Sequence, residues 1–226
     1  MFGRIVRRYD VMNRLMTGGR DVRWRREAAR LALGEPGSGA RVLDVATGTG
    51  DLALALADEG AAFVVGLDFA VPMVRAAKAK GHEPRAVTWV VGDALCMPFP
   101  DNQFDACTVS FGLRNMASYE QALREMARVI RPGGRLVCLE LTPLRRPVIG
   151  AVFNWYFTRI VPLIGGLLSG DPVAYRYLPR SVAAFPSADE LAALMRRSGF
   201  AHVSFRLRGG GTVALHVALK PRAGDV

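Results

Sequence analysis

The alternation of short apolar runs with helical segments most limits the folds open to this 226-residue chain. Apolar, β-like runs and segments with helical spacing succeed one another, a pattern typical of a parallel sheet with helices between its strands. The expected strands cover residues 41–46, 63–68, 87–93, 104–111, 135–141, 201–207 and 212–219. The expected helices cover residues 51–59, 72–80, 119–130 and 187–199. We therefore predict one doubly wound α/β domain spanning residues 1–226.

Two segments fall outside this alternation and are expected to form additions to the sheet. Residues 1–33 predict a basic, partly amphipathic helical cap, and residues 143–186 an apolar insertion. The stretch from Val148 to Leu168 is almost long enough to span a bilayer. Because Asn154, Arg159, Pro162 and a glycine pair interrupt it, we interpret the insertion as a lid over an apolar pocket.

The charge of the chain is strongly positive, with a formal net charge of +10 and an isoelectric point near 10.4. Nine arginines fall within the first thirty residues: Arg4, Arg7, Arg8, Arg14, Arg20, Arg23, Arg25, Arg26 and Arg30. Three interpretations stay open: a solvated surface, a nucleic-acid patch, or a face attracted to anionic lipid.

The three cysteines are far apart and form no CxxC pair, which indicates neither a disulfide framework nor a metal site. Together with the lack of a signal peptide, this predicts a cytoplasmic protein.

A glycine turn and two acidic strand ends predict a cofactor site. Ala46 ends the first strand, and Gly48 and Gly50 follow it, where they let a ligand approach the backbone. Asp68 ends the second strand, at a position suited to accept both hydroxyls of an adenosine ribose. Asp93 ends the third strand and can accept a hydrogen bond from an adenine amine. Because parallel strands end at one edge of the sheet, these residues should line one crevice.

A nicotinamide dinucleotide and S-adenosylmethionine both suit such a site, and two differences separate them. The dinucleotide fingerprint requires a third glycine, where this chain has Ala53, and a helix start that favours phosphate. Asp51 instead places negative charge at that helix start. These residues favour S-adenosylmethionine, which carries no phosphate.

Several longer motifs resemble those of the ubiquinone/menaquinone-biosynthesis C-methyltransferases, a family of class I methyltransferases. Residues 9–13 (Tyr-Asp-Val-Met-Asn), followed by Thr17, Gly19 and Trp24, are similar to its N-terminal signature. Residues 128–142 are similar to its second signature, with Arg131 and Thr142 where lysine and serine are more usual. Residues 97–101, 110–115, 175–178 and 213–216 also look familial.

The resemblance implies a seven-stranded, Rossmann-like, mostly parallel sheet whose last strand is antiparallel. It also implies that S-adenosylmethionine is the cofactor and that a prenylated quinol, demethylmenaquinol or a methoxybenzoquinol, is the substrate. The family's cofactor contacts fall here on Thr49, Asp68, Asp93, Ala94 and Ser110. Thr47 stands where relatives have small residues including glycine.

Methylation of a ring carbon requires a neighbouring phenolic hydroxyl, with a pKa of about 10, to lose its proton. Arg114 follows the fourth strand beside the predicted crevice, and we expect it to stabilise the phenolate or orient a water. A structural ion pair is its alternative role. Tyr9 and His216 are weaker candidates for a proton relay.

Other functional classes fit less well. Amine methylation of nucleic-acid bases requires an Asn/Asp-Pro-Pro-aromatic motif where this chain has Ser-Phe-Gly-Leu at residues 110–113, and cytosine C5 chemistry requires a suitably placed cysteine. RNA or another small aromatic molecule is thus the alternative substrate, and a binding module without activity is disfavoured by the acidic strand ends.

For partners we expect reversible contact with the inner face of the cell membrane and no nucleic acid. A homodimer is left open.

Overall fold

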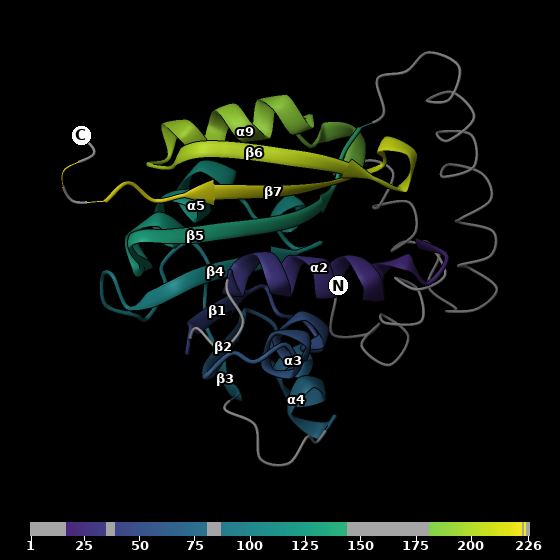
Figure 1. Ribbon diagram of the computed structural model, residues 1–226. Coiled ribbons are helices and arrows are strands. Elements are labelled where there is room, and N and C mark those ends of the chain that lie inside the picture. The colour runs from purple at the N-terminus through teal and green to yellow at the C-terminus, as the bar shows by residue number, and fades with distance from the viewer. Residues whose placement is uncertain (1–16, 35–38, 81–86, 144–180, 223, 225–226) are drawn as a thin grey trace.

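The computed structural model describes residues 17–34, 39–80, 87–143, 181–222 and 224. Its centre is a seven-stranded sheet in the order β3-β2-β1-β4-β5-β7-β6 (Figure 1). The strands are β1 (Arg41–Val45), β2 (Phe63–Asp68), β3 (Val87–Val91), β4 (Phe104–Ser110), β5 (Ile130–Leu141), β6 (Ala201–Arg208) and β7 (Val213–Leu219). Strands β1 to β5 pair in parallel, and β7 runs antiparallel between β5 and β6. The predicted doubly wound, mostly parallel sheet is confirmed.

Helices cover both faces of this sheet (Figure 1). On one face lie α2 (Arg20–Leu33), α3 (Asp51–Asp58) and α4 (Val71–Ala79), and on the other α5 (Tyr119–Val129) and α9 (Ala188–Arg197). Two 3₁₀ turns, η2 (Leu113–Asn115) and η4 (Gly209–Gly211), complete the described elements.

The apolar residues of the strands alternate between two buried cores, one under each helical layer. Val42 of β1 belongs to the core beneath α2 and α3, whereas Leu43 belongs to the core beneath α5 and α9. Successive side chains of a strand point to opposite faces, so a strand buried on both sides is apolar throughout. This is why the central strands could be recognised as continuous apolar runs.

The ends of the helices follow the capping signals in the sequence. Ser187 and Glu190 form the predicted capping box at the start of α9, with the Glu190 side chain accepting from the Ser187 N–H at 2.8 Å. The predicted stop after residue 130 differs in detail. The Arg-Pro-Gly-Gly segment continues directly into β5, and a register shift between β4 and β5 accommodates it.

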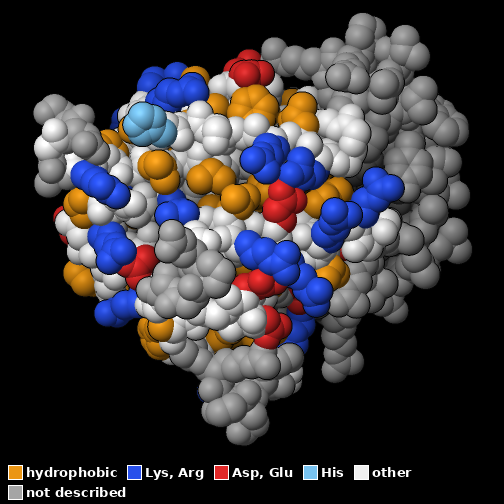
Figure 2. Space-filling model, in the orientation of Figure 1, with side chains coloured by type: hydrophobic (Ala, Val, Ile, Leu, Met, Phe, Trp, Pro, Cys, Tyr) orange, Lys and Arg blue, Asp and Glu red, His pale blue; other side chains and the backbone are white. Residues whose placement is uncertain are grey.

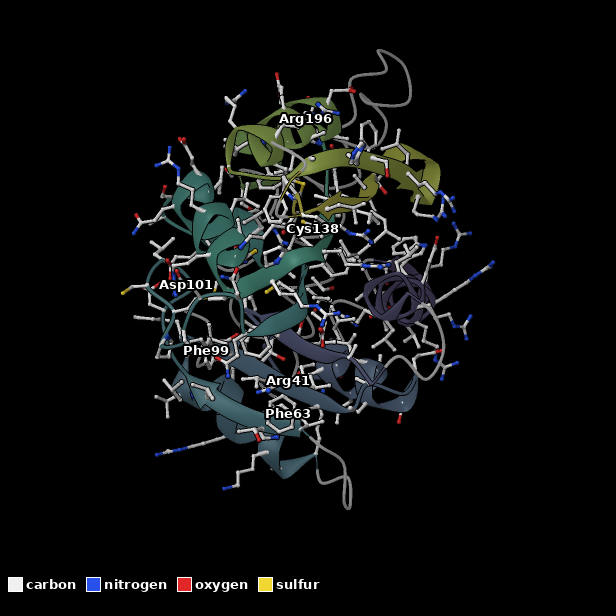
Figure 3. All side chains as sticks on the ribbon, turned by 60° about the vertical axis from the view of Figure 1, so that its left-hand side comes forward. Arg41, Phe63, Phe99, Asp101, Cys138 and Arg196 are labelled. Carbon is white, nitrogen blue, oxygen red and sulfur yellow. The ribbon has the colours of Figure 1, made fainter. Side chains whose placement is uncertain are left out.

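Structural contacts hold the amino ends of β1 and β2. Arg41 and Phe63, which begin β1 and β2, lie together with the guanidinium carbon 5.9 Å from the ring centroid (Figure 3). The Arg41 N–H also donates to the Asp105 carboxylate. The predicted cofactor residues lie at the opposite, carboxyl ends of the strands.

The predicted lid falls mostly on residues 144–180, which lie outside the described residues, as do residues 1–16 of the predicted N-terminal cap. The remainder of the cap is α2, which packs on α3, β4 and β5. No helix among the described segments is long and apolar enough to cross a membrane.

Candidate functional site

The glycine turn between β1 and α3 is shaped by left-handed backbone and by a close approach to Trp89. Gly48 has φ 58° and Gly50 has φ 85°, conformations that cost other residues energy. A Cβ atom on Gly50 would lie 2.4 Å from the Trp89 ring. The turn therefore sits on the indole of β3, and a side chain at residue 50 would displace it.

Asp68, at the end of β2, connects to this turn. Its Oδ2 accepts from the Gly48 N–H at 2.8 Å, and its Oδ1 accepts from the Ala70 N–H at 2.9 Å. Burial raises the pKa of Asp68, and the two backbone N–H groups oppose that rise. Since each carboxylate oxygen can accept more than one hydrogen bond, Asp68 retains capacity for ligand hydroxyls.

Two residues without glycine's freedom adopt left-handed backbone at the point where the strand order reverses. Ala46 follows β1 with φ 53°, and Phe111 follows β4 with φ 55°. Between them, a Cβ on Gly112 would lie 2.6 Å from the Ala46 Cβ. Strained backbone of this kind concentrates at functional sites, and the gap between β1 and β4 is the switch point at which open α/β sheets bind ligands.

The switch point opens into a cleft of about 380 Å³. Its walls come from the carboxyl ends of β1, β2, β3 and β4 and are mostly apolar, with Phe69, Met73 and Leu95 among them. Phe69 lines the cleft and is 76% exposed. An apolar cleft with a few polar groups at its rim is typical of a cofactor pocket.

The predicted cofactor residues divide between this cleft and a smaller pocket beside it. The cleft is lined by Ala46, Gly48, Asp68, Asp93 and Ala94, as the strand-end pattern predicted. The smaller pocket is lined by Thr49 and Ser110, together with Ala46 and Gly48. Gly50 lines neither space and acts through the shape of the turn.

Asp93 and Ser110 retain hydrogen-bonding capacity at the site. Asp93 is exposed, and the one hydrogen bond found for its side chain comes from the Leu95 N–H to Oδ1 at 2.9 Å. The Ser110 hydroxyl is buried and has no partner among the described residues. Because a buried polar group without a partner is costly, this hydroxyl indicates a ligand-binding position.

Asp44 of β1 is a buried carboxylate behind the glycine turn. Thr47 and Thr108 donate hydroxyl hydrogen bonds to it at 2.6 and 2.7 Å. Burial raises the pKa of Asp44 to about 6, against the effect of these two hydrogen bonds. The unusual threonine at position 47 therefore has a structural role, which is to satisfy this carboxylate.

Arg114 lies in η2, immediately after β4, and is buried in an ion pair. Its Nη1 donates to Glu140 of β5 at 2.6 Å and to the Phe111 carbonyl oxygen at 2.6 Å. Glu140 also accepts from the Arg114 and Leu141 N–H groups. The structure thus contains the ion pair that the alternative, structural role requires, and Arg114 does not line the cleft.

Of the two weaker catalytic candidates, His216 falls within the described residues and Tyr9 does not. His216 is fully buried in β7, opposite Cys138 of β5, and lines neither pocket. Its Nε2 donates to the Ala188 carbonyl oxygen at 2.9 Å, and its ring packs on Phe205. Burial lowers the pKa of His216, which favours a neutral ring. Tyr9 lies outside the described residues.

Sequence reasoning missed several residues that line the cleft or the small pocket, and two polar ones among them are Asn115 and Arg25. Asn115 lines the cleft, and its Oδ1 is buried without a partner among the described residues. Arg25 of α2 lines the small pocket. Asn115 stands within the motif at 110–115 and could have been chosen, whereas the position of Arg25 depends on how α2 packs. The described residues contain no cluster of three His, Cys, Asp or Glu side chains that could hold a metal.

Comparison with known proteins decides the family. Residues 1–220 match the ubiE/COQ5 methyltransferase family. The chain belongs to this family. It is 50% identical to a demethylmenaquinone methyltransferase of Thermus thermophilus, over 98% of this chain and 100% of that protein. It is 43% identical to a ubiquinone/menaquinone biosynthesis C-methyltransferase of Syntrophotalea carbinolica, over 100% of this chain and 94% of the relative.

The solved structures agree on the fold. A SAM-dependent methyltransferase of Thermotoga maritima, described as a possible histamine N-methyltransferase, aligns with a TM-score of 0.67 over 97% of this chain and 98% of its own. Its sequence is 20% identical, so the likeness concerns the fold alone. Together, the family and the class I fold make this ubiE/COQ5 family member a methyltransferase and imply the use of S-adenosylmethionine.

Proposed function

We propose that the chain transfers the methyl group of S-adenosylmethionine to a ring carbon of a prenylated quinol, with demethylmenaquinol as the foremost substrate. The observation that carries the proposal is the 50% identity to a demethylmenaquinone methyltransferase over the full length of both proteins. The cleft agrees with it, because it lies at the switch point of the sheet and has a largely apolar lining.

The residues of the cleft suit the adenosine part of the cofactor. Asp68 would accept from the ribose hydroxyls, and Asp93 with Ala94 would hold the adenine edge. Phe69, Met73 and Leu95 offer apolar surface for the base. The cofactor supplies an electrophilic methyl group on sulfur, and the chain's contribution is to align the acceptor carbon with it and exclude water.

The acceptor carbon becomes nucleophilic when the quinol hydroxyl gives up its proton. Asn115 is the described polar residue best placed to meet that hydroxyl, since it lines the cleft with an unpartnered buried oxygen. Its neighbour Arg114 would contribute positive charge that stabilises the phenolate, or would hold the turn that presents Asn115. Tyr9 stays a weaker candidate for the proton relay.

The decisive experiment compares acceptors under identical conditions. Purified protein would be incubated with S-adenosylmethionine labelled in its methyl group and with short-tailed demethylmenaquinol, methoxybenzoquinol or RNA. We expect label in the demethylmenaquinol product, with the methoxybenzoquinol as a second acceptor. Label in RNA alone would overturn the proposal and favour the alternative suggested by the basic charge.

We further propose that the protein acts at the inner surface of the cell membrane without crossing it. A prenyl tail would hold the substrate in the bilayer, and Arg20, Arg23 and Arg26 of α2 are exposed. Figure 2 shows lysine and arginine side chains gathered over this face, interspersed with a few acidic ones. Cationic residues that reach an anionic surface contribute about 1 kcal/mol each.

A further inference from the structure

The cleft runs along the carboxyl ends of four neighbouring strands, which lie side by side in the order β3, β2, β1 and β4 (Figure 1). Neighbouring strands are about 4.8 Å apart, so β3 and β4 are separated by roughly 14 Å. Asp68 and Asp93, the two acidic residues suited to adenosine, lie at the end formed by β2 and β3. The end formed by β4 is therefore left for the methyl group and for the molecule that accepts it.

The β4 end of the cleft, here called the acceptor end, has a largely apolar wall. It consists of the five cleft residues that follow β4: Phe111, Gly112, Asn115, Met116 and Ala117. Of these five, only Asn115 carries a polar side chain. Such a surface favours an apolar ring and disfavours an ether oxygen, which would lose its hydrogen bonds to water there.

The amide of Asn115 is oriented by the turn that precedes it. Its Nδ2 donates to the Phe111 carbonyl oxygen at 3.5 Å, and its backbone N–H donates to the Gly112 carbonyl oxygen at 3.1 Å. The Oδ1 atom, on the other side of the amide, is buried and has no partner among the described residues. An oxygen held in this way can accept from one hydroxyl of a quinol, which places the quinol ring beside the next residue of the chain, Met116.

Met116 is the large residue of the acceptor end that keeps accessible surface. It is half-buried against the core beneath α5 and α9, whereas Phe111 is only 3% exposed. Its backbone is fixed, because its N–H donates to the Leu113 carbonyl oxygen at 3.1 Å. Methionine combines a flexible side chain with a polarisable sulfur that contacts aromatic rings favourably. Met116 can therefore adapt to a flat ring that lies beside Asn115.

We propose that Met116 is a specificity-determining residue, whose side chain packs against the second ring of a bicyclic quinol and favours it over a monocyclic methoxybenzoquinol. The inference rests on the proposed methylation of a quinol and deepens it by naming the residue that selects the ring. Demethylmenaquinol has a fused apolar ring, which would cover Met116. A methoxybenzoquinol has no second ring, and its methoxy oxygen would meet an apolar side chain.

The test measures kcat/KM for short-tailed demethylmenaquinol and short-tailed methoxybenzoquinol, each with saturating S-adenosylmethionine. The natural chain should prefer demethylmenaquinol about tenfold, since additional apolar contact in a pocket discriminates to about this extent. Met116→Ala should lower this preference about tenfold, through a lower kcat/KM for demethylmenaquinol. Met116→Leu keeps the apolar bulk, so its preference should stay within about threefold of that of the natural chain.

Met116→Gln is the sharper variant, because it keeps the length of the side chain and adds an amide. Its N–H can donate to a methoxy oxygen, so the preference should shift about tenfold or more toward methoxybenzoquinol. A residue that only maintained the fold would lower kcat/KM for both acceptors together when replaced.

Met73→Leu is the matched control. Met73 is also a methionine of the cleft, but it lies in α4, which follows β2, and thus at the adenosine end. Its replacement should change kcat/KM for both acceptors by the same factor and leave the preference as it is.

Calorimetric titration with S-adenosylhomocysteine, the product of the cofactor, completes the test. Met116→Ala and Met116→Gln should bind it within about twofold of the natural chain. A loss of this affinity as large as the loss of kcat/KM would assign Met116 to the cofactor and overturn the inference. Methylation of demethylmenaquinol with an unchanged preference in both variants would overturn the inference alone. If the natural chain methylated neither quinol, the proposed function would fall as well, and the two failures are thereby distinguished.

Discussion

Asp68 joins the cofactor site to the backbone that shapes it, because it accepts N–H groups from Gly48 and Ala70. We expect Asp68→Ala to lower the affinity for S-adenosylhomocysteine about tens- to a hundredfold, through loss of the ribose contacts and loosening of the glycine turn. Asp68→Asn should lose less, because its amide oxygen can still accept. Isothermal calorimetry on both variants, with circular dichroism to confirm folding, measures this. Unchanged affinity in a folded Asp68→Ala protein would remove Asp68 from the site.

Asp44 gives the stability of the chain a specific pH dependence. Burial raises its pKa to about 6 in the folded state, from an ordinary value of 3.8. The folded state therefore binds the proton more tightly than the unfolded state, and stability is lost as pH rises through this window. Asp44→Asn cannot titrate, so its stability relative to the natural chain should increase by up to about 3 kcal/mol between pH 4 and pH 7. Urea unfolding of both proteins without cofactor measures the difference, and a pH-independent difference would contradict the prediction.

The substitution Gly50→Ala tests how far the glycine turn depends on its packing against β3. Gly39→Ala is the matched control, since Gly39 has φ 64° and open space around its Cβ position. That variant should lose about 1–2 kcal/mol of stability from left-handed backbone alone. Gly50→Ala should lose more and also bind S-adenosylhomocysteine more weakly, because its Cβ would lie 2.4 Å from Trp89. Equal losses of stability, with equal affinities, would show that the contact with Trp89 has no consequence.

At the scale of elements, the ion pair of Arg114 with Glu140 ties the turn after β4 to β5. Arg114→Gln leaves Glu140 buried alone and should cost about 3–5 kcal/mol. Combining it with Glu140→Gln should restore much of that loss. Single-turnover methylation by the double variant then separates the two roles of Arg114. A near-normal rate would mean that the arginine only positions the turn, and a rate that stays low would mean that its charge stabilises the phenolate.

The elements themselves were largely predictable from the sequence, because each central strand is an apolar run between turn signals. Residue 46 was assigned to the first strand, but Ala46 adopts left-handed backbone, and nothing in its type indicates this. Gly112 approaches Ala46 closely across the switch point, a contact that the sequence pattern does not reveal. His216 shows the opposite limit. A histidine can take part in catalysis, so the residue type alone made His216 a candidate. The packing of α9 on β7 instead places its ring against the Ala188 carbonyl oxygen, with which it forms a hydrogen bond.

At the scale of the whole molecule, the site depends on contacts between segments far apart in the chain. The strand-end acids could be placed together because parallel strands share an edge. The link from Arg25 to Asp51 joins residues 26 positions apart, and that from Lys80 to Asp51 joins residues 29 apart. Sequence spacing does not predict such contacts, since they depend on how α2, α3 and α4 pack on one face of the sheet. The place of Arg25 beside the glycine turn was therefore missed, whereas the crevice at the strand ends was predicted.

The fold shows on which faces of the molecule the arginines behind the net charge of +10 are exposed. Arg20, Arg23 and Arg26 are exposed on α2, whereas Arg124, Arg196 and Arg197 are exposed on α5 and α9, which cover the opposite face of the sheet. If α2 faces the membrane, the protein should sediment with anionic vesicles at low salt, less with zwitterionic vesicles, and less at high salt.

Replacing the three α2 arginines by glutamine should weaken this binding about a hundredfold, at about 1 kcal/mol for each residue. The same replacement of Arg124, Arg196 and Arg197 removes an equal charge and should have little effect. Equal weakening by both sets would mean that net charge, rather than the α2 face, attracts the vesicles. A protein that stays in solution with anionic vesicles at low salt would show that the arginines are only a solvated surface, because electrostatic attraction is strongest under that condition.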